Sequence, residues 1–362
     1  MLTIKKQLFG YQPLCYVKDG LLLSHNKKLF ISDCELENIL FLCDMPSTFI
    51  EKALLKSRVL SRIFRVYVRF ALNVGDKFVF IVSGSNLWRV NLDTLEVTLD
   101  FVIPDNRTAL YLTLVEGSVG TKDKVVFGEY FNNPNMNAVR VWGTDVDDVS
   151  SWQQLYEFEP NEINHIHNII CGEQHDDCYI LAGDFNDAAS IWKTDKEFNT
   201  IVPWVRGKQK YRACWGLVSE DGIAYATDTQ KEFNSFCYLA GKEISSSEQI
   251  EGSSIYFGKN SNRTFFSTTV EPDEPTGSFL RDVFSYKLGV GILSNKSKLY
   301  SVNSQNEIKV EFEGVKDILP TRLAQFGSFM FPSGSMDSSN IVIYAVALKS
   351  VDGCCLLLSD SN

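Results

Sequence analysis

Two of the four histidines in this chain stand one residue apart, in the sequence His165-Ile-His167. In a β-strand, residues i and i+2 point to the same face, so we expect both imidazoles on one side and Ile166 on the other. Such a pair can ligate a metal ion, with Glu129 or Asp184 supplying an oxygen. It can also serve as general acid and base near neutral pH. The third interpretation is a pair of hydrogen-bonded histidines with a structural role.

Four acidic residues each follow an apolar run and open a polar loop. They are Glu129, Asp184, Asp228 and Glu271, and they lie 55, 44 and 43 residues apart. Carboxyl groups crowded into a low-dielectric site raise the pKa of one and leave another ionised, which is the arrangement that glycoside hydrolysis needs. Acids at strand ends also bond to loop backbone groups, so a structural role is the alternative for each of them.

The basic and aromatic residues near these positions suggest an anionic ligand. The planar fork of Arg binds a carboxylate bidentately, which makes an acidic sugar a natural ligand. A tyrosine can stack on a sugar ring, and Tyr211 can also act as acid or base. An exposed Arg or Tyr at a strand start is the alternative, surface interpretation. The predicted substrate-binding residues are Arg65, Arg69, Tyr130, Lys208, Gln209 and Arg212, with Lys210 in the same basic group.

The elements that must position these residues are short strands. Runs such as Lys77–Ser83, Asp177–Ala182 and Asn340–Val346 are rich in β-branched and aromatic residues and are bounded by Gly, Asn, Asp or Ser. Many short strands of even spacing indicate a sandwich, barrel or propeller. The repeat of the four acids decides between them, because a period of about 45 residues is the length of one four-stranded propeller blade.

The sequence therefore predicts one all-β domain over residues 1–362, a propeller of seven four-stranded antiparallel blades, with six as the alternative. Residues 48–64 have apolar positions at helical spacing and are predicted as a helical insertion. Residues 2–9 are predicted to add a strand to the last blade, because closing the ring removes exposed sheet edges. The predicted blades span 15–46, 65–105, 108–160, 162–207, 209–252, 253–305 and 306–360.

A propeller brings the two sets of chemical residues together. The innermost strand of each blade starts at one face of the ring, and the loop after the second strand opens on that face. The strand starts supply Arg65, Arg69, His165, His167, Gln209, Tyr211 and Arg212, and the ends of the second strands supply Glu129, Asp184, Asp228 and Glu271. We expect these residues to converge around the axial mouth, within reach of one sugar ring.

Several local patterns carry a resemblance to a known family. Ser/Thr-Asp turns occur at Asp33, Asp145 and Asp195, the second of them followed by Trp152, and we predict that these three acids stabilise outer turns. Together with Phe127-Gly-Glu-Tyr130, His165-Ile-His167, Gly183-Asp184 and Gln209-Lys-Tyr-Arg212, they resemble sialidase-like (BNR-repeat, Asp-box) propellers. In particular, they look like uncharacterised glycosidase-like proteins associated with bacterial surface-polysaccharide biosynthesis. The chain departs from true sialidases because its Asp boxes lack their glycine and no arginine triad or Tyr–Glu pair can be matched.

The resemblance implies a carbohydrate-active protein, and three functions compete. The first is a glycoside hydrolase acting on an acidic or complex bacterial glycan, with two of the four acids as proton donor and nucleophile or base. The second is a polysaccharide lyase in which His165, His167, Tyr211 and Arg212 carry a β-elimination. The third is a non-catalytic glycan-binding or scaffolding propeller, because a fold does not fix a function.

The bulk composition narrows the partners. A net charge of -10 and a pI near 5.0 argue against broad binding to nucleic acid. The N-terminus lacks the apolar core of a signal peptide, and no apolar run reaches membrane-spanning length. The nine cysteines are odd in number and lack CxxC spacing, so we expect nine free thiols in a cytoplasmic protein. We expect no cofactor other than the divalent metal that His165 and His167 could hold.

Overall fold

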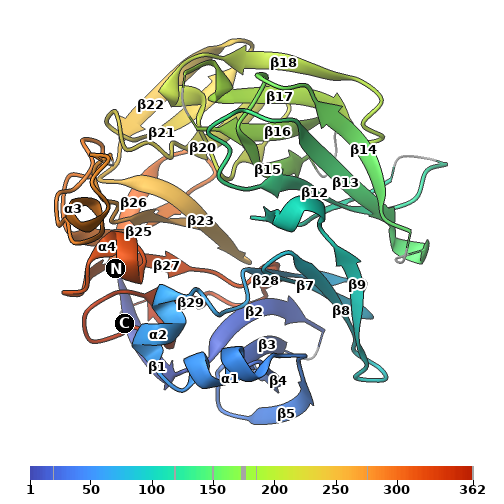
Figure 1. Ribbon diagram of the computed structural model, residues 1–362, viewed down its shortest axis with the longest axis vertical. Helices are drawn as coiled ribbons and strands as arrows, with labels where there is room; N and C mark the ends of the chain where they lie inside the picture. Colours follow the sequence, from blue (N-terminus) through green and yellow to red (C-terminus); the bar gives the residue numbers. More distant parts are fainter. Residues whose placement is uncertain are drawn as a thin grey trace.

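The computed structural model of the chain is a ring of seven antiparallel sheets around a central axis (Figure 1). It describes residues 1–18, 20–117, 120–148, 151–172, 177–184, 186–274 and 276–360. The predicted all-β fold of seven blades is confirmed. In each blade the first strand lies nearest the axis and later strands follow outward.

The first four blades keep strict sequence order. Blade 1 contains β2 (Gln12–Val17), β3 (Gly20–His25), β4 (Lys28–Ser32) and β5 (Ile39–Asp44); blade 2 contains β6 (Phe70–Val74), β7 (Phe78–Ser83), β8 (Asn86–Asn91) and β9 (Val97–Val102). Blade 3 contains β10 (Thr108–Ala109) and β11 (Thr113–Val115), both paired with β12 (Lys124–Tyr130), then β13 (Val139–Asp145) and β14 (Gln153–Phe158); blade 4 contains β15 (His165–Cys171), β16 (Asp177–Gly183), β17 (Ser190–Asp195) and β18 (Ile201–Arg206).

The remaining blades bring the chain back to its start. Blade 5 contains β19 (Leu217–Val218), β20 (Gly222–Ala226), β21 (Ser235–Ala240) and β22 (Glu243–Gln249); blade 6 contains β23 (Ser253–Asn260), β24 (Thr264–Thr269), β25 (Lys296–Val302) and β26 (Ile308–Val315), with β28 (Ser335–Met336) beside β23. Blade 7 contains β27 (Ser328–Met330), β29 (Ile341–Val346), β30 (Cys354–Asp360) and β1 (Leu2–Phe9).

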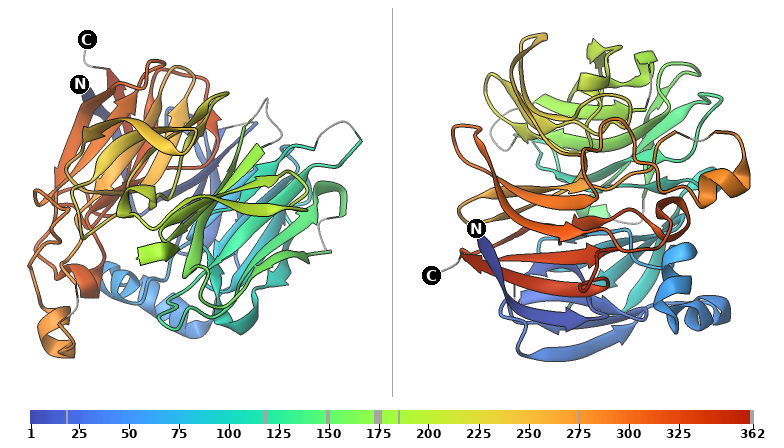
Figure 2. Two further views of the ribbon diagram at one scale, coloured as in Figure 1. Left: turned by 90° about the horizontal axis from the view of Figure 1, so that it is seen from above. Right: turned by 90° about the vertical axis from the view of Figure 1, so that its left-hand side faces the viewer.

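The ring is closed by the two ends of the chain. Strand β1 pairs antiparallel with β30, from Leu2 opposite Asp360 to Phe9 opposite Cys354, so the N-terminal strand is the outermost strand of blade 7. Figure 2 shows the two termini side by side on this blade. The prediction that residues 2–9 complete the last blade is confirmed.

The predicted boundary between the last two blades is wrong. We placed it after residue 305, but β26 (308–315) pairs along its length with β25 and completes blade 6. The loop that joins β24 to β25 carries an inserted helix, α3 (Phe279–Val283), which makes blade 6 longer than the repeat period. Blade 7 therefore begins at β27, after the short helix α4 (Thr321–Ala324).

The predicted helical insertion consists of two helices, α1 (Phe49–Leu55) and α2 (Arg58–Ile63), between blades 1 and 2. The break arises because Ser57 caps a new helix: its Oγ accepts the backbone N–H of Leu60 at 3.4 Å. Four 3₁₀ turns complete the helical elements, at η1 (Pro104–Asn106), η2 (Val146–Asp148), η3 (Asn186–Ala188) and η4 (Gln209–Tyr211). In the described part of the chain, no helix is long and apolar enough to cross a membrane.

The apolar core lies between the blades. Each pair of neighbouring blades shares one cluster of buried side chains, as where Val126 of blade 3 meets Ile166 and Ile180 of blade 4. The interface between blades 7 and 1 is of the same kind, with Val342 and Leu357 against Leu21. Removing apolar surface from water drives this packing, so each blade is stable only between two neighbours.

One pair of cysteines contradicts the expectation of nine free thiols. Cys171 at the end of β15 and Cys178 at the start of β16 are directly opposite in the hairpin, with Cα atoms 4.2 Å apart, and they form a disulfide. Their pairing is set by strand register, which the spacing of cysteines in the sequence does not reveal. The other seven are free thiols.

The three Asp turns differ from one another. Each lies at the end of the third strand of a blade, but among the described residues only two of them hold their loop by several backbone bonds. Asp33 accepts the N–H groups of Glu37 and Asn38 at 2.7 and 3.1 Å. The carboxylate of Asp195 accepts three, from residues 197, 199 and 200, at 2.8, 3.2 and 3.2 Å. Asp145 instead lies 4.0 Å from Lys122, in a turn whose residues 149 and 150 lie outside the described residues.

This difference gives a stability prediction. Asp195→Ala removes the acceptor of three backbone N–H groups and should lower the free energy of unfolding by about 1–2 kcal/mol. Asp145→Ala, the matched control, removes a half-exposed carboxylate and should change it by less than about 0.5 kcal/mol. Denaturant unfolding of both variants measures the two effects, and equal losses would contradict the assignment.

Candidate functional site in the axial channel

The four predicted acids occupy equivalent places in four consecutive blades. Glu129 lies in β12, and Asp184, Asp228 and Glu271 follow β16, β20 and β24, which are the second strands of blades 3 to 6. Equivalent places do not give equivalent environments. Asp184 and Asp228 both form ion pairs with Arg212. Glu271 is influenced by the charge of Asp228, whereas Glu129 pairs with Arg107.

Glu129 holds strands together and is not brought to the histidines. Its side chain is fully buried, pairs with Arg107, and accepts the backbone N–H of Arg140 at 2.9 Å and the indole N–H of Trp142 at 3.1 Å. Neighbouring residues of a strand face opposite sides, so Tyr130 rather than Glu129 faces the histidines. The prediction of Glu129 as a candidate catalytic acid or metal ligand is therefore not supported.

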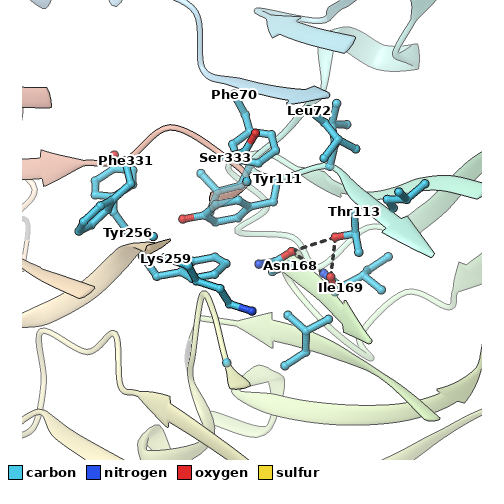
Figure 3. Close-up of a pocket in the computed structure, with 18 of the residues that line it drawn as sticks. Phe70, Leu72, Tyr111, Thr113, Asn168, Ile169, Tyr256, Lys259, Phe331 and Ser333 are labelled. Carbon is cyan, nitrogen blue, oxygen red and sulfur yellow. Dashed lines mark hydrogen bonds between the residues drawn. The ribbon is translucent and has the colours of Figure 1, made fainter. Parts of the chain in front are cut away.

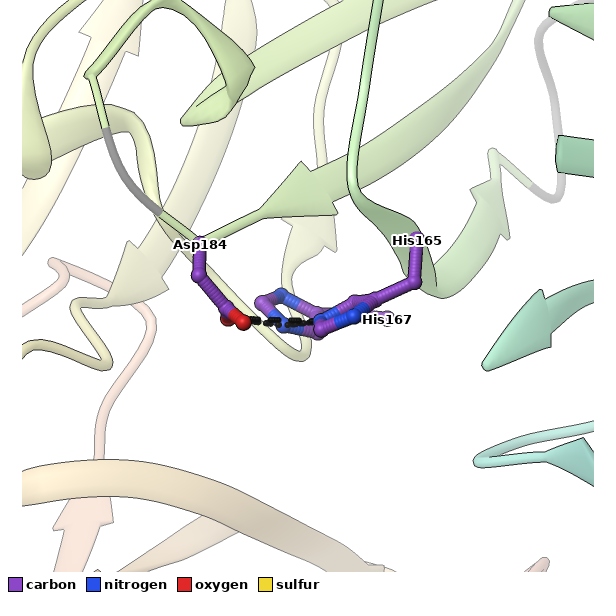
Figure 4. A group of neighbouring side chains, drawn as sticks. All are labelled: His165, His167 and Asp184. Carbon is purple, nitrogen blue, oxygen red and sulfur yellow. Dashed lines mark hydrogen bonds and ion pairs between the residues drawn. The ribbon is translucent and has the colours of Figure 1, made fainter. Parts of the chain in front are cut away.

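His165, His167 and Asp184 form a compact cluster (Figure 4). The two Nε2 atoms are 3.0 Å apart, and Oδ1 of Asp184 lies 3.2 Å from Nε2 of His165 and 3.4 Å from Nε2 of His167. Both imidazoles are almost completely buried. The cluster thus combines the two strongest local signals of the sequence, the His-x-His pair and the second of the four acids.

Backbone features of blade 4 make this cluster possible. The register of β15 against β16 shifts between Ile166 and Asn168, so His167 sits at a bulge. Gly183 of β16 is the strand partner of His165, and a Cβ there would come within 2.3 Å of the His167 ring. The absence of a side chain at Gly183 therefore provides the space that the imidazole fills.

Each imidazole is also tied to a neighbouring blade. Nδ1 of His165 lies 3.0 Å from the carbonyl oxygen of Phe131, which follows β12 of blade 3. Nδ1 of His167 lies 2.9 Å from the carbonyl oxygen of Ala213, which precedes β19 of blade 5. The pair therefore joins three blades at the axis, and its orientation depends on the ring being closed.

Arg212 links the two acids of blades 4 and 5. Its guanidinium lies 3.1 Å from Oδ1 of Asp184 and 3.2 Å from Oδ2 of Asp228, and it is itself buried. Burial alone would raise the pKa of Asp184, but the nearby charge of Arg212 holds it well below its usual range. Asp184 is therefore ionised at neutral pH.

Glu271 has the opposite electrostatic character. It accepts hydrogen bonds from Thr269 Oγ1 at 2.5 Å and Gln230 Nε2 at 2.6 Å, and its side chain is almost completely buried. Burial, followed by the negative charge of Asp228, raises the pKa of Glu271 to about 7. It is not among the described residues that line either cavity of the channel.

A small cavity opens beside the cluster, and we call it the mouth cavity. Its volume is about 100 Å³, and its lining includes Arg65, Arg69, Tyr130, His167 and Asp228. The Tyr130 ring packs on the His165 ring, with the two ring centroids 4.5 Å apart. The Arg69 guanidinium lies over the Tyr130 ring, 5.6 Å from its centre. The predicted convergence of Arg65, Arg69 and Tyr130 with His167 is observed.

Two predicted binding residues, Lys208 and Gln209, and the predicted catalytic residue Tyr211 have other positions. We expected residues 209–212 to start an inner strand, but residues 209–211 form η4, and the inner strand of blade 5 begins at Leu217. Tyr211 is buried in the apolar cluster between blades 4 and 5, which removes it from the mouth. Gln209 donates to the backbone oxygen of Asp184 at 2.9 Å and so positions that loop, while Lys208 lines a shallow surface hollow with Lys210.

A larger cavity of about 740 Å³, which we call the axial cavity, continues from the mouth cavity (Figure 3). The two share Tyr67, Arg69, Leu110, Tyr256 and Met330. The axial cavity is lined from the inner strands of several blades, with aromatic walls that include Tyr111, Phe257 and Phe331. None of the described residues that line it is acidic, whereas Arg69 and Lys259 are basic.

Lys259, Asn168 and Tyr256 are residues that sequence reasoning missed. They lie on the inner strands β15 and β23, beyond the strand starts where the sequence placed the site. The sequence did contain a sign of this role, because Lys259 is the only charged residue in the run Ser253–Asn260. Burying an unpaired charge between two blades is costly, so a lysine on an inner strand is expected in the channel.

Comparison with known proteins shows the fold only. No protein-family model matches the chain, and no curated protein matches it. Among solved structures, an oligogalacturonate lyase in complex with manganese is similar over 100% of this chain and 91% of its own, at 12% identity and a TM-score of 0.59. The oligogalacturonate lyase of Vibrio parahaemolyticus matches over 98% and 90%, at 13% identity and a TM-score of 0.52. The AfRom2 CNH domain matches over 100% and 99%, at 9% and 0.57.

The raised pKa of Glu271 predicts how stability depends on pH. A carboxyl group that binds its proton more tightly in the folded state stabilises the fold below its unfolded pKa, near 4.5, and that contribution is lost as pH rises to about 7. Glu271→Gln keeps an acceptor oxygen but cannot ionise. Its stability relative to the native chain should therefore increase between pH 5 and pH 8, by on the order of 2 kcal/mol.

Denaturant unfolding of both proteins at the two pH values provides the test. Parallel pH profiles for the native chain and the Glu271→Gln variant would contradict the electrostatic assignment.

Proposed function

We propose that the protein binds an acidic sugar chain in its axial channel. The observation that carries this proposal is the charge of the axial cavity: a chain with a net charge of -10 lines this cavity with Arg69 and Lys259 and with no acidic residue among those described. These two positive charges would attract an anion into the channel, although the overall negative charge of the protein repels anions.

The shape and walls of the axial cavity support a sugar chain as the anion. Its volume of about 740 Å³ lies within the range of pockets that hold ligands of several rings. The aromatic side chains of Tyr111, Tyr256 and Phe331 offer flat apolar surface, and Asn168 and Lys259 offer hydrogen-bond donors in the same cavity (Figure 3). Flat apolar faces next to donors suit the ring and the carboxylate of a uronic acid.

Analogy supports the same class of ligand. Two solved structures with this fold are named oligogalacturonate lyases, whose substrate is an acidic sugar chain. The turns at Asp33 and Asp195 add the sequence resemblance to sialidase-like propellers. On that resemblance we propose a bacterial surface polysaccharide or its precursor as the ligand and the cytoplasm as its setting. Fold-level analogy raises the prior for carbohydrate but does not assign a reaction.

For a reaction, the positions of the acids favour β-elimination over glycoside hydrolysis. Hydrolysis needs two carboxyl groups facing the sugar, one of them protonated. Glu129, Asp184 and Glu271 are not among the described residues that line either cavity. Among the described residues, Asp228 alone supplies a carboxyl group to the mouth cavity. The hydrolysis that the sequence suggested would need a second carboxyl group there.

Elimination requires groups that the mouth cavity does provide. A base removes the proton next to the uronate carboxylate, the bond to the leaving oxygen breaks as the double bond forms, and an acid protonates that oxygen. Oδ1 of Asp228 is buried without a hydrogen-bond partner among the described residues and can take the proton. Arg69 can neutralise the carboxylate, and Tyr130, whose pKa burial raises, stays protonated as the donor.

The binding proposal predicts a dependence on one lysine and on the ligand's charge. Lys259→Gln should weaken the binding of an oligogalacturonate by about tenfold or more, since it removes a charge-assisted contact. Binding of the methyl-esterified oligogalacturonate should be weak for both proteins. Lys242→Gln, in the exposed turn between β21 and β22, is the matched control and should bind like the native chain. Isothermal titration calorimetry measures all six affinities.

Equal affinity for the charged and the esterified oligosaccharide would contradict an anion site. An equal loss in the Lys242→Gln variant would show that the effect comes from the overall charge and not from the channel.

The elimination proposal predicts the product. Incubation with an oligogalacturonate should release unsaturated, ultraviolet-absorbing ends. Tyr130→Phe and Asp228→Asn should reduce that rate by about 10²-fold or more while the affinity for the oligosaccharide stays within a few-fold. New reducing ends without ultraviolet absorption would indicate hydrolysis instead, and no cleavage together with tight binding would leave the channel as a binding site only.

A further inference from the structure

The protonation of the two clustered histidines is fixed by their outer contacts. Nδ1 of His165 lies 3.0 Å from the Phe131 carbonyl, and Nδ1 of His167 lies 2.9 Å from the Ala213 carbonyl. A carbonyl oxygen can only accept a hydrogen bond, so both Nδ1 atoms must carry the hydrogen. In the neutral rings, both Nε2 atoms are then bare lone pairs.

Three acceptor atoms consequently face one another in a buried space. The two Nε2 lone pairs are 3.0 Å apart, and Oδ1 of Asp184 lies 3.2 and 3.4 Å from them (Figure 4). Acceptors at such distances repel unless something positive lies between them, and burial makes that repulsion stronger. The guanidinium of Arg212, 3.1 Å from Oδ1 of Asp184, offsets part of this repulsion. A cation in contact with all three atoms would remove the rest.

A proton is a poor candidate for that cation. A single N–H on one Nε2 points along one direction and can satisfy one of the two remaining acceptors, which leaves the third contact repulsive. A metal ion placed between the three atoms is in contact with all of them at once.

The dimensions of the triangle fit a metal ion. Ligand atoms about 2.1 Å from a metal are about 3.0 Å apart at right angles and about 3.4 Å apart at the tetrahedral angle. The three observed separations, 3.0, 3.2 and 3.4 Å, fall within that interval. All three ligands would then lie on one side of the ion, which leaves coordination positions on its other side.

We propose that His165, His167 and Asp184 hold a divalent transition-metal ion at the wall of the mouth cavity. Two imidazole nitrogens and one carboxylate oxygen suit zinc, manganese or iron better than calcium or magnesium, which prefer oxygen ligands. The carbonyls of Phe131 and Ala213 orient the imidazoles, as partners outside the ligand shell commonly do. His167 lines the mouth cavity, so the ion would lie next to the space where a ligand would bind.

The test is metal binding by the whole protein, measured without any sugar, so that it is independent of the proposed function. Protein treated with a chelator and then dialysed should bind one Mn²⁺ per chain, followed by electron paramagnetic resonance, and Zn²⁺ should compete for the same site. Asp184→Asn, His165→Asn and His167→Asn should each weaken Mn²⁺ binding by at least about tenfold. Asn suits the histidine positions because its Nδ2 can still donate to the carbonyl that Nδ1 contacts.

Two control variants keep the result specific. His25→Asn changes a histidine of blade 1 that bonds to Gly10 and Asn26, far along the chain from the cluster, and should leave Mn²⁺ binding unchanged. Cys214→Ser tests the neighbouring group of His167, Cys214 and Asp228, which could hold an ion in the first cluster's place, and it should also bind normally. A thermal melt of each variant confirms that the ring is folded.

Three results would overturn the proposal. They are no binding of Mn²⁺ or Zn²⁺ by the native chain, undiminished binding by folded Asp184→Asn and His165→Asn, and loss of binding in Cys214→Ser alone.

Discussion

The structure depends on the burial of both faces of every blade. A four-stranded sheet of this size has two largely apolar faces, and each shared cluster between neighbouring blades buries one face from each side. A blade at the end of an open row would expose one of them, so the row must close. Closure comes from β1, which reaches from the start of the chain to pair with β30 at its end. Blade 7 therefore cannot form until both ends of the chain are in place.

Ring closure also sets the geometry of the candidate site. The two imidazoles belong to blade 4, but their Nδ1 atoms are held by blades 3 and 5, and Arg212 from the next blade holds Asp184. Three adjacent blades thus orient one small cluster, and a shift of blade 3 or blade 5 would break the contacts that hold its side chains in place. Sites built on rigid elements in this way are more precise than sites on loops alone. The axial cavity is lined by inner strands of the same blades, so the mouth cavity and the axial cavity both depend on the closed ring.

Much of the fold was predictable because it follows from period and pattern. The spacing of the four acids predicted the blade repeat, and the cost of exposed sheet edges predicted that residues 2–9 close the ring. The site was predictable only in part. His165, His167, Asp184, Arg212 and Asp228 were expected together and are together. Glu129 and Tyr211 were expected there and are not, because the direction of a side chain depends on strand alternation and on where an inner strand begins. The Cys171–Cys178 disulfide and the role of Lys259 depend on register and on the position of the axis, which local patterns do not encode.

The central claim is that a metal ion occupies the space between three buried acceptors at the end of a channel for acidic sugars. The most direct measurement is an anomalous difference map from a crystal of the protein grown with Mn²⁺. The account predicts a single strong peak about 2.1 Å from Nε2 of His165, Nε2 of His167 and Oδ1 of Asp184. A map with no peak at this position, and with the three atoms still 3.0 to 3.4 Å apart, would contradict it.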